Sequence, residues 1–177
     1  MMAALLLASA SFAGAEDAVL TNIANLDFEQ VNKDNTCFAW NKNAEACFDN
    51  PQAGKACAKQ ISNGSNWDAI LHIPAFRAEP KTKYRLSVWS RNTLTGGNAK
   101  YGVRFIDAKQ ETMSSLQGGY LWKPVKNGKD KWTEYKFEFT TPEGLAYLNI
   151  YFMVDKPQGD IFWDSVKIEK IVSAEKQ

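Results

Sequence analysis

Apolar and polar residues alternate along most of this chain in short runs, and turn-forming residues separate the runs. The clearest run covers residues 84–91, in which Tyr84, Leu86 and Val88 alternate with Arg, Ser and Trp positions. Alternation with a period of two places successive side chains on opposite faces of a strand. Each such run therefore predicts a β-strand with one buried face.

Most of the chain divides into runs of this kind, and no convincing helix follows residue 15. The expected strands cover residues 26–29, 37–40, 44–48, 55–62, 67–73, 84–91, 101–107, 132–140, 145–154 and 161–171. The segment 108–131 is polar and rich in glycine and lysine, and we expect it to be irregular. Many short strands at regular spacing predict an all-β fold, a two-sheet antiparallel β-sandwich. Its expected core residues occupy alternate strand positions: Phe28, Tyr84, Leu86, Val88, Phe137, Leu148, Ile150, Phe152, Val166 and Ile168.

The first 15 residues carry no charge and end in Ala13-Gly14-Ala15, a small-residue cleavage pattern. Their apolar run is too short to span a bilayer, so residues 1–15 are expected to be a signal peptide. No Lys or Arg precedes that run, and a flexible apolar N-terminus is the alternative. One domain then covers residues 16–172, followed by a polar tail at 173–177. The expected location is secreted, periplasmic or on the cell surface.

The charge balance argues against a nucleic-acid partner or an anionic membrane, because the formal net charge is only +1. No apolar run approaches the length of a membrane span. The aromatic content is more informative: six Trp, six Tyr and ten Phe exceed what a core of this size needs. Some of these rings are therefore expected on the surface for a functional reason.

The three cysteines, Cys37, Cys47 and Cys57, are spaced ten residues apart. Export favours one disulfide and leaves one thiol over. A turn at 50–54 lies midway between Cys47 and Cys57, so this pair is slightly preferred to Cys37–Cys47, for which the same argument works. The CxxC spacing of a zinc site is absent, and the single His72 offers little scope for a histidine-based metal site.

The chain lacks the sequence signatures of common enzymes: G-x-S-x-G, H-E-x-x-H, a phosphate loop and a dinucleotide fingerprint. Glu134 and Glu138 fall on one strand face, but four strand residues separate them by roughly 13 Å, beyond either geometry of glycoside hydrolysis. We therefore expect a protein that binds rather than catalyses.

Four segments resemble those of jelly-roll carbohydrate-binding modules of the family 4, 9, 16 and 22 group. They are Asn-Leu-Asp-Phe-Glu at 25–29, Glu-Pro-Lys-Thr-Lys-Tyr-Arg-Leu-Ser-Val-Trp at 79–89, Trp-Thr-Glu-Tyr-Lys-Phe-Glu-Phe at 132–139, and Asp-Ile-Phe-Trp-Asp-Ser-Val-Lys-Ile at 160–168. Their order and spacing bracket nearly the whole domain. Lys81-Thr82 stands where the family often has glycine, a difference that a type I turn tolerates. The resemblance implies a jelly roll and a polysaccharide or oligosaccharide ligand.

The resemblance also implies a structural calcium ion where the first and last strands meet. The matching positions are Glu29 and Asp164, with the main-chain carbonyl of Lys59 as a further ligand. Calcium prefers six to eight oxygen ligands of this kind. The alternative is that both carboxylates are ordinary strand-end or turn residues.

The sugar-binding face is expected on the non-core side of the strands. Sugars present C–H faces that stack on aromatic rings and hydroxyls that need polar partners. The strand phase turns five such residues outward, namely Trp89, Arg91, Arg104, Asn149 and Tyr151, and three more aromatic residues in irregular stretches are expected to wall the cleft, namely Trp40, Tyr120 and Trp122. The alternative is a structural, adhesion or protein-binding domain of the same fold, associated with other exported or surface proteins.

Overall fold

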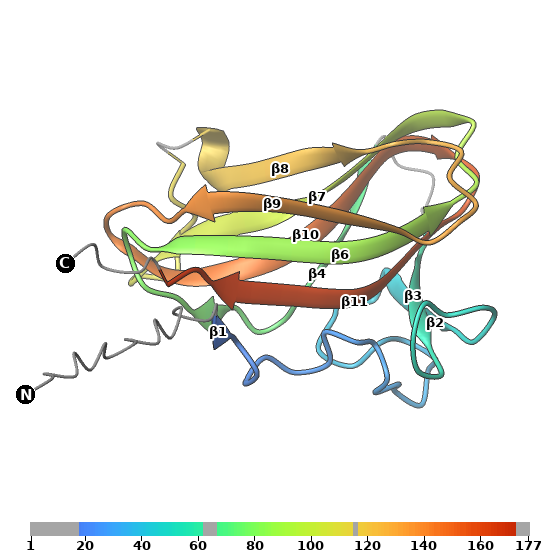
Figure 1. Ribbon diagram of the computed structural model, residues 1–177, viewed down its shortest axis with the longest axis horizontal. Coiled ribbons are helices and arrows are strands. Elements are labelled where there is room, and N and C mark those ends of the chain that lie inside the picture. The colour runs from blue at the N-terminus through green and yellow to red at the C-terminus, as the bar shows by residue number, and fades with distance from the viewer. Residues whose placement is uncertain (1–17, 62–66, 115–116, 173–177) are drawn as a thin grey trace, which may run out of the picture.

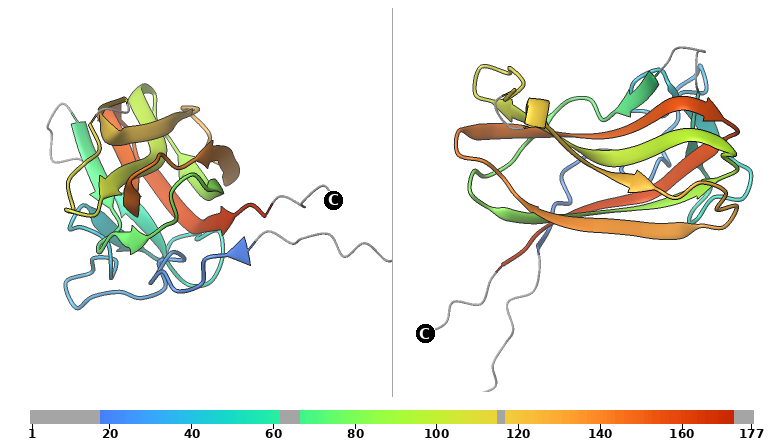
Figure 2. Two further views of the ribbon diagram at one scale, coloured as in Figure 1. Left: turned by 90° about the vertical axis from the view of Figure 1, so that its left-hand side faces the viewer. Right: turned by 90° about the horizontal axis from the view of Figure 1, so that it is seen from above.

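The computed structural model describes residues 18–61, 67–114 and 117–172 and confirms an all-β sandwich. Two antiparallel sheets pack face to face, and Figure 2 shows the two layers edge-on. Within the described residues, no helix is long and apolar enough to cross a membrane. The expected signal peptide at 1–15 and the polar tail at 173–177 lie outside the described residues.

The first sheet is six-stranded and carries both ends of the described chain (Figure 1). Its order is β2 (Ala44–Cys47), β3 (Cys57–Gln60), β11 (Ile161–Lys170), β6 (Lys83–Asn92) and β9 (Thr133–Thr140). The short strand β1 (Ala18–Val19) pairs with the end of β11, so the two ends of the sandwich domain lie side by side. This arrangement brings the first and last strands together.

The second sheet is five-stranded and is built around its two longest strands. Its order is β4 (Trp67–Leu71), β10 (Leu145–Gln158), β7 (Gly96–Asp107) and β8 (Tyr120–Val125), and β5 (Phe76–Arg77) pairs with the start of β10. The 3-10 helix η1 (Gln117–Gly119) directly precedes β8. The pairing of β7 with β10 runs from Asp107 opposite Leu145 to Gly96 opposite Gln158, so it holds the centre of this sheet together.

The sequence interpretation missed β8, which lies inside the segment expected to be irregular. Pro124 within this strand disguised it, because proline cannot donate to a sheet ladder and is confined to sheet edges. The strand is indeed the edge of the five-stranded sheet, and within the described residues it pairs only with β7. Its two large aromatic residues, Tyr120 and Trp122, also face outward rather than into the core.

The strands expected at 26–29 and 37–40 are wrong, because this region forms turns and isolated bridges. Phe28 has a φ of 60°, which no extended strand can contain. The Asn25 side chain holds the segment instead: its amide donates to the Gln30 and Phe38 carbonyls at 2.9 and 2.7 Å. A side chain that satisfies backbone groups in this way replaces the ladder that a strand would supply.

All ten residues expected in the core are buried. Nine of them lie on strands and confirm the strand phases, whereas Phe28 is buried from an irregular segment. At the centre of the core, four aromatic rings stack in series across the sandwich. The ring centroids of Trp163 (β11) and Phe152 (β10) lie 4.4 Å apart, and those of Phe152 and Trp40 lie 5.5 Å apart. The Phe28 ring packs against Trp40 at a tilt of 31°, with centroids 4.8 Å apart. The indole N–H of Trp163 donates to Gln60 at 3.0 Å, so its polar atom is satisfied. The stack therefore joins both sheets and the irregular N-terminal segment.

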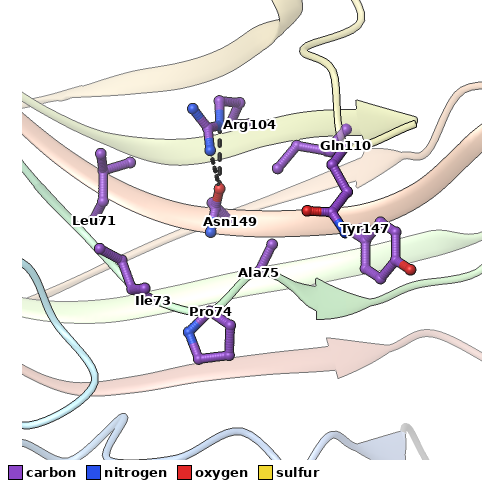
Figure 3. A pocket seen from close by; sticks show the side chains of 9 residues that line it. Leu71, Ile73, Pro74, Ala75, Arg104, Gln110, Tyr147 and Asn149 are labelled. Atoms are coloured by element: carbon purple, nitrogen blue, oxygen red, sulfur yellow. Dashed lines mark hydrogen bonds between the residues drawn. The ribbon is translucent and has the colours of Figure 1, made fainter. Parts of the chain in front are cut away.

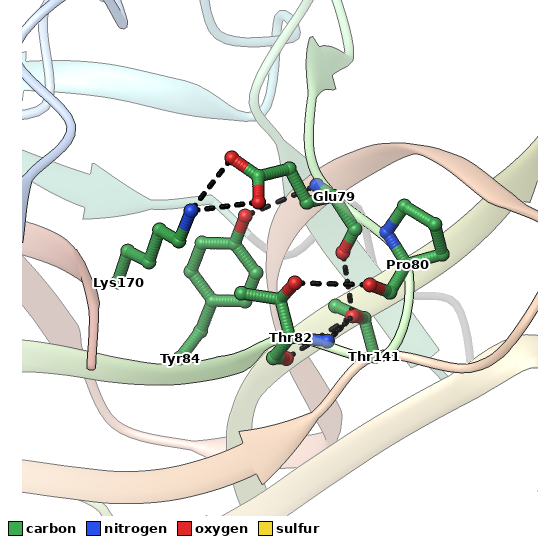
Figure 4. A network of polar contacts seen from close by, with 6 residues as sticks. All are labelled: Glu79, Pro80, Thr82, Tyr84, Thr141 and Lys170. Carbon is green, nitrogen blue, oxygen red and sulfur yellow. Dashed lines mark hydrogen bonds and ion pairs between the residues drawn. The ribbon is translucent and has the colours of Figure 1, made fainter. Parts of the chain in front are cut away.

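The turn before β6 ties three strands together through polar contacts (Figure 4). The Thr141 hydroxyl donates to the Glu79 carbonyl at 2.6 Å and accepts from the Thr82 amide at 2.9 Å. The Tyr84 hydroxyl accepts from the Glu79 amide at 3.1 Å, and Lys170 pairs with the Glu79 carboxylate at 2.6 Å. The ends of β9 and β11 and the start of β6 are thereby held at one point.

Lys81 in this turn has a φ of 52°, so the expectation that a type I turn tolerates it is wrong. A residue with a Cβ is strained in the left-handed region, which explains a glycine preference at this position. Lys81→Gly should raise the free energy of unfolding by about 0.5–1 kcal/mol, measured by urea denaturation.

The matched control is Lys81→Ala, which keeps the Cβ but removes the exposed ion pair of Lys81 with Glu143, 3.0 Å long. Such exposed pairs contribute little. Equal stability of the glycine and alanine variants would contradict the strain at this turn.

Candidate functional site

The outer face of the five-stranded sheet gathers aromatic side chains from three of its strands, β4, β10 and β8. Tyr151 of β10 lies opposite Leu71 of β4 and opposite Gly102 of β7, and Gly102 lies opposite Trp122 of β8. Directly opposed residues of a sheet share one face. These side chains therefore form one row across the sheet, from β4 to β8.

A second row runs beside the first. Asn149 of β10 lies opposite Arg104 of β7, and Arg104 lies opposite Tyr120 of β8. The core residues that alternate with these two rows, Ile150 and Val103, point to the opposite face and are fully buried. Because Ile150 and Val103 must be buried, the residues that alternate with them on β10 and β7 face outward.

Two cavities lie on this face and share Leu71. The aromatic pocket, about 640 Å³, is lined by Trp67, Ala69, Leu71, Tyr120, Trp122, Tyr151, Met153 and Asp155. The arginine pocket, about 430 Å³, is lined by Leu71, Ile73, Pro74, Ala75, Arg104, Ile106, Gln110, Tyr147 and Asn149 (Figure 3). We call the two pockets together the groove.

Exposed rings wall the aromatic pocket. Trp67 is 62% exposed and Trp122 is 43% exposed, which is unusual for such large apolar side chains. The Tyr120 ring packs edge-on against Tyr151, with centroids 5.2 Å apart and planes at 82°. Burial raises the pKa of the Tyr151 phenol, so its hydroxyl stays protonated at neutral pH. The Lys100 ammonium lies 3.8 Å from the Trp122 ring centroid and holds that ring against the sheet.

The floor of the groove depends on Gly102. A Cβ at this position would overlap the Leu121 carbonyl oxygen and come within 2.8 Å of the Trp122 Cα. Only glycine lets β8 approach β7 this closely. The close approach brings Trp122 and Tyr120 to the same rim as Tyr151.

Hydrogen bonds orient the polar groups of the arginine pocket. The Arg104 Nε and Nη2 both donate to the Asn149 Oδ1, the former at 3.1 Å. The Asn149 Nδ2 donates to the main-chain carbonyl of His72 at 2.8 Å, and this residue is only 3% exposed. At the rim, the Arg77 guanidinium lies 5.5 Å from the Tyr147 ring centroid. The groove therefore has one apolar end and one end rich in hydrogen-bond donors.

Five of the expected sugar-binding residues lie together on this face: Arg104, Tyr120, Trp122, Asn149 and Tyr151. The sequence interpretation missed Trp67, the most exposed tryptophan among the large exposed apolar residues. Its signal was available, because it begins a predicted strand in which Ile70 and His72 point inward. The same phase turns Trp67 and Leu71 outward.

Trp89 and Arg91 do not join the groove, so the expectation that they share its face is wrong. Both lie on β6, on the outer face of the other sheet. The Arg91 guanidinium stacks over Phe162 at 4.3 Å and lies 5.7 Å from Trp132. Alternation assigns a side chain to a face of its own strand, but it does not say which sheet the strand joins.

Trp40 does not wall the groove either. It is 6% exposed, lies within the core stack and donates its indole N–H to the Asn25 carbonyl at 2.9 Å. An indole with a buried hydrogen-bond partner is satisfied inside the core.

Cys47 and Cys57 lie directly opposite each other on β2 and β3, as the hairpin argument expected. The disulfide itself is not formed, and all three cysteines have free thiols. The Cys57 sulfur lies 3.5 Å from the main-chain carbonyl oxygen of Cys47 and points to it as a thiol donor. Burial raises the pKa of the Cys37 thiol to about 12, so this thiol stays protonated.

Glu29 and Asp164 both hold the loop between β2 and β3. The Glu29 carboxylate accepts hydrogen bonds from the amides of Lys55 and Ala56 at 2.9 and 3.1 Å. The Asp164 carboxylate accepts from Gln52 and Ala53 at 2.8 and 3.2 Å. Burial, opposed by these amides and assisted by the charge of Glu29, raises the pKa of Asp164 to about 6. The loop thus presents amide hydrogens to both carboxylates.

This donor set does not fit the expected calcium ion. A calcium site needs carbonyl and carboxylate oxygens turned toward one point, whereas these oxygens already accept N–H groups. Lys59 lies opposite Phe162 of β11, two residues from Asp164, and its side chain pairs with Asp160 at 2.9 Å. The geometry of the 52–56 loop therefore does not favour the calcium ion that the resemblance implies.

A chelator should therefore leave the melting temperature unchanged, because an ion that binds only the folded state would have to stabilise it. The measurement is a thermal melt in calcium-containing buffer with and without excess EDTA. A clear drop in melting temperature with EDTA would show that the loop rearranges around an ion.

His72 holds Asn149 of the groove through its main-chain carbonyl, and its buried imidazole should make the free energy of unfolding depend on pH. It is 2% exposed, and its ring nitrogens lie 2.8 Å from the Ala24 carbonyl oxygen and 3.1 Å from that of Pro74. Burial lowers its pKa, although the two carbonyls oppose the shift. Because the folded chain resists the proton that the unfolded chain accepts, the free energy of unfolding should fall as the pH is lowered below about 6.5.

The chain has one histidine, so its imidazole signals can be followed by NMR without ambiguity. We expect the imidazole of His72 to titrate below its ordinary pKa of about 6.5, with denaturant midpoints that decrease on acidification. A titration midpoint at or above about 6.5 would contradict this prediction.

The comparisons with known proteins agree with the fold. A family profile described as "Carbohydrate binding domain" matches residues 21–159. The CBM22-1 xylan-binding domain of Paenibacillus barcinonensis Xyn10C has a similar structure, with a TM-score of 0.62 and 13% identity, covering 84% of this chain and 93% of that one. The structure called Family 16 Carbohydrate Binding Module-2 has a TM-score of 0.59 and 19% identity, covering 82% of this chain and 97% of that one. At these identities the likeness is one of fold.

A curated relative is the tRNA nuclease WapA of Bacillus subtilis (strain 168), 24% identical over 123 residues. The match covers 67% of this chain but only 5% of the nuclease. This chain therefore corresponds to a small part of that protein.

Proposed function

Because this chain belongs to the carbohydrate-binding domain family, we propose that it binds a glycan in the groove and catalyses no reaction on it. The observation that carries the proposal is the meeting of two exposed tryptophans, Trp67 and Trp122, with Tyr120 on one sheet face. Exposed rings can stack on the C–H faces of sugars. Arg104 lies beside them, held in place by Asn149, and can donate hydrogen bonds to sugar hydroxyl groups.

The charges of the groove support binding without catalysis. Among the described residues that line it, Asp155 is the only carboxylate, whereas glycoside hydrolysis uses a pair. Glu134 and Glu138 lie on the other sheet, where Glu138 pairs with Lys83 at 2.6 Å and with Arg85 at 2.7 Å. Hydrogen bonds from these two cationic side chains lower the pKa of Glu138, so it is a poor proton donor at neutral pH.

Export is part of the proposal and depends on residues 1–15, whose composition is that of a signal peptide. A secreted or surface location would place the groove among extracellular polysaccharides. One similar domain is named for xylan, so a soluble xylan and a soluble β-glucan are the first ligands to test.

Trp122→Ala and Trp67→Ala should each weaken glycan affinity about tenfold, because each removes an exposed stacking ring. Both side chains are largely exposed, so the fold should survive their loss. The measurement is retardation in gels that contain xylan, β-glucan and other soluble glycans, followed by calorimetry on the best ligand.

Trp89→Ala is the matched control, because it removes a tryptophan from the other sheet. This variant should bind like the parent. If Trp89→Ala loses binding while both groove variants keep it, the site lies on the other sheet. If the parent binds no glycan of the panel, a protein-binding role is favoured instead.

A further inference from the structure

Two of the four arginines of the chain stand at the same end of the groove without a carboxylate partner. Arg85 and Arg91 form ion pairs on the other sheet. Arg104 and Arg77, by contrast, have no carboxylate within ion-pair distance among the described residues; their contacts are with Asn149 and the Tyr147 ring. An arginine that is half-buried without a counter-ion keeps its full charge available to a ligand.

The geometry of Arg104 leaves part of its guanidinium free. Its Nε and Nη2 both donate to the single Oδ1 of Asn149, which is a neutral acceptor. No described protein group accepts from its Nη1. Figure 3 shows the guanidinium above Asn149, with Leu71 to one side and Gln110 to the other. The free N–H groups are therefore presented within the arginine pocket.

The rest of the groove does not neutralise this charge. None of the described residues that line the arginine pocket is acidic. Asp155, the carboxylate of the groove, lines the aromatic pocket and lies six residues from Asn149 along β10, about 20 Å away on an extended strand. That distance exceeds the Debye length at physiological salt. The arginine pocket is thus a positive end, and the aromatic pocket holds the stacking rings.

We propose that the glycan carries a carboxylate, as a uronic acid residue, that binds Arg104 in the arginine pocket. This inference rests on the proposed glycan binding and adds the chemical class of the sugar. Carboxylate is the planar acceptor that matches the guanidinium fork, and Arg77 adds a second positive charge at the rim. Neutral sugars of the same chain then stack on Trp67 and Trp122.

The test compares acidic oligosaccharides with the same oligosaccharides after reduction of the carboxyl group to an alcohol. The probes are a glucuronic-acid-substituted xylo-oligosaccharide, an oligogalacturonate and an oligomannuronate, each measured by calorimetry at low and high salt. At least one acid should bind about tenfold more tightly than its reduced form, and the difference should shrink as salt rises.

Arg104→Gln should reduce the ratio of the affinities for the acid and for its reduced form to about one, because glutamine can still form hydrogen bonds but carries no charge. Arg104→Lys is the matched variant, which keeps the charge without the fork and should retain part of the ratio. Arg77→Gln, at an exposed position, should lower the ratio about twofold.

Equal affinity for every acid and its reduced form would overturn the uronic acid inference and leave neutral glycan binding intact. A preference for an acid that survives in Arg104→Gln would also overturn it, because the carboxylate would then bind elsewhere. Failure to bind any sugar, acidic or neutral, would overturn the proposed function as well.

Discussion

The stack of four aromatic rings through the core is the interaction on which the rest of the structure depends. It links Trp163 of one sheet to Phe152 of the other, and through Trp40 to Phe28 in the irregular N-terminal segment. Each of these rings buries a large apolar area, which is the main favourable contribution to folding. Because Phe152 must point into the stack, its neighbours on β10, Tyr151 and Met153, must point into the groove.

The same core also orients the polar groups of the groove. His72 packs edge-on against Trp40, with centroids 5.1 Å apart. Its main-chain carbonyl accepts from Asn149, and Asn149 in turn accepts from Arg104. A substitution that loosens the stack would therefore disturb the guanidinium through a chain of contacts, without touching any surface residue. Such pre-organisation lowers the entropic cost of ligand binding.

The two outer faces of the sandwich differ in how their charges are used. On the six-stranded sheet, Arg85 pairs with Glu138 and Glu169, and Lys167 also pairs with Glu169. These charges satisfy one another across the strands, as is usual for a solvated sheet face. On the five-stranded sheet, Arg104 and Tyr120 face a hollow that no segment of the described chain fills. The proposed binding surface is thus the face whose polar groups lack partners from the described chain.

The sequence by itself determined the strand phases, because apolar positions with a period of two must face the core. It therefore placed Asn149, Tyr151 and Arg104 outward correctly, and it identified the fold through four short segments. It could not assign strands to sheets, since pairing joins residues far apart in the chain, and Trp89 was therefore grouped with the groove. It could not see that Lys81 adopts a positive φ, or that the amides of the 52–56 loop point at Glu29 and Asp164. Those features arise from contacts between distant segments, and only the tertiary structure decides them.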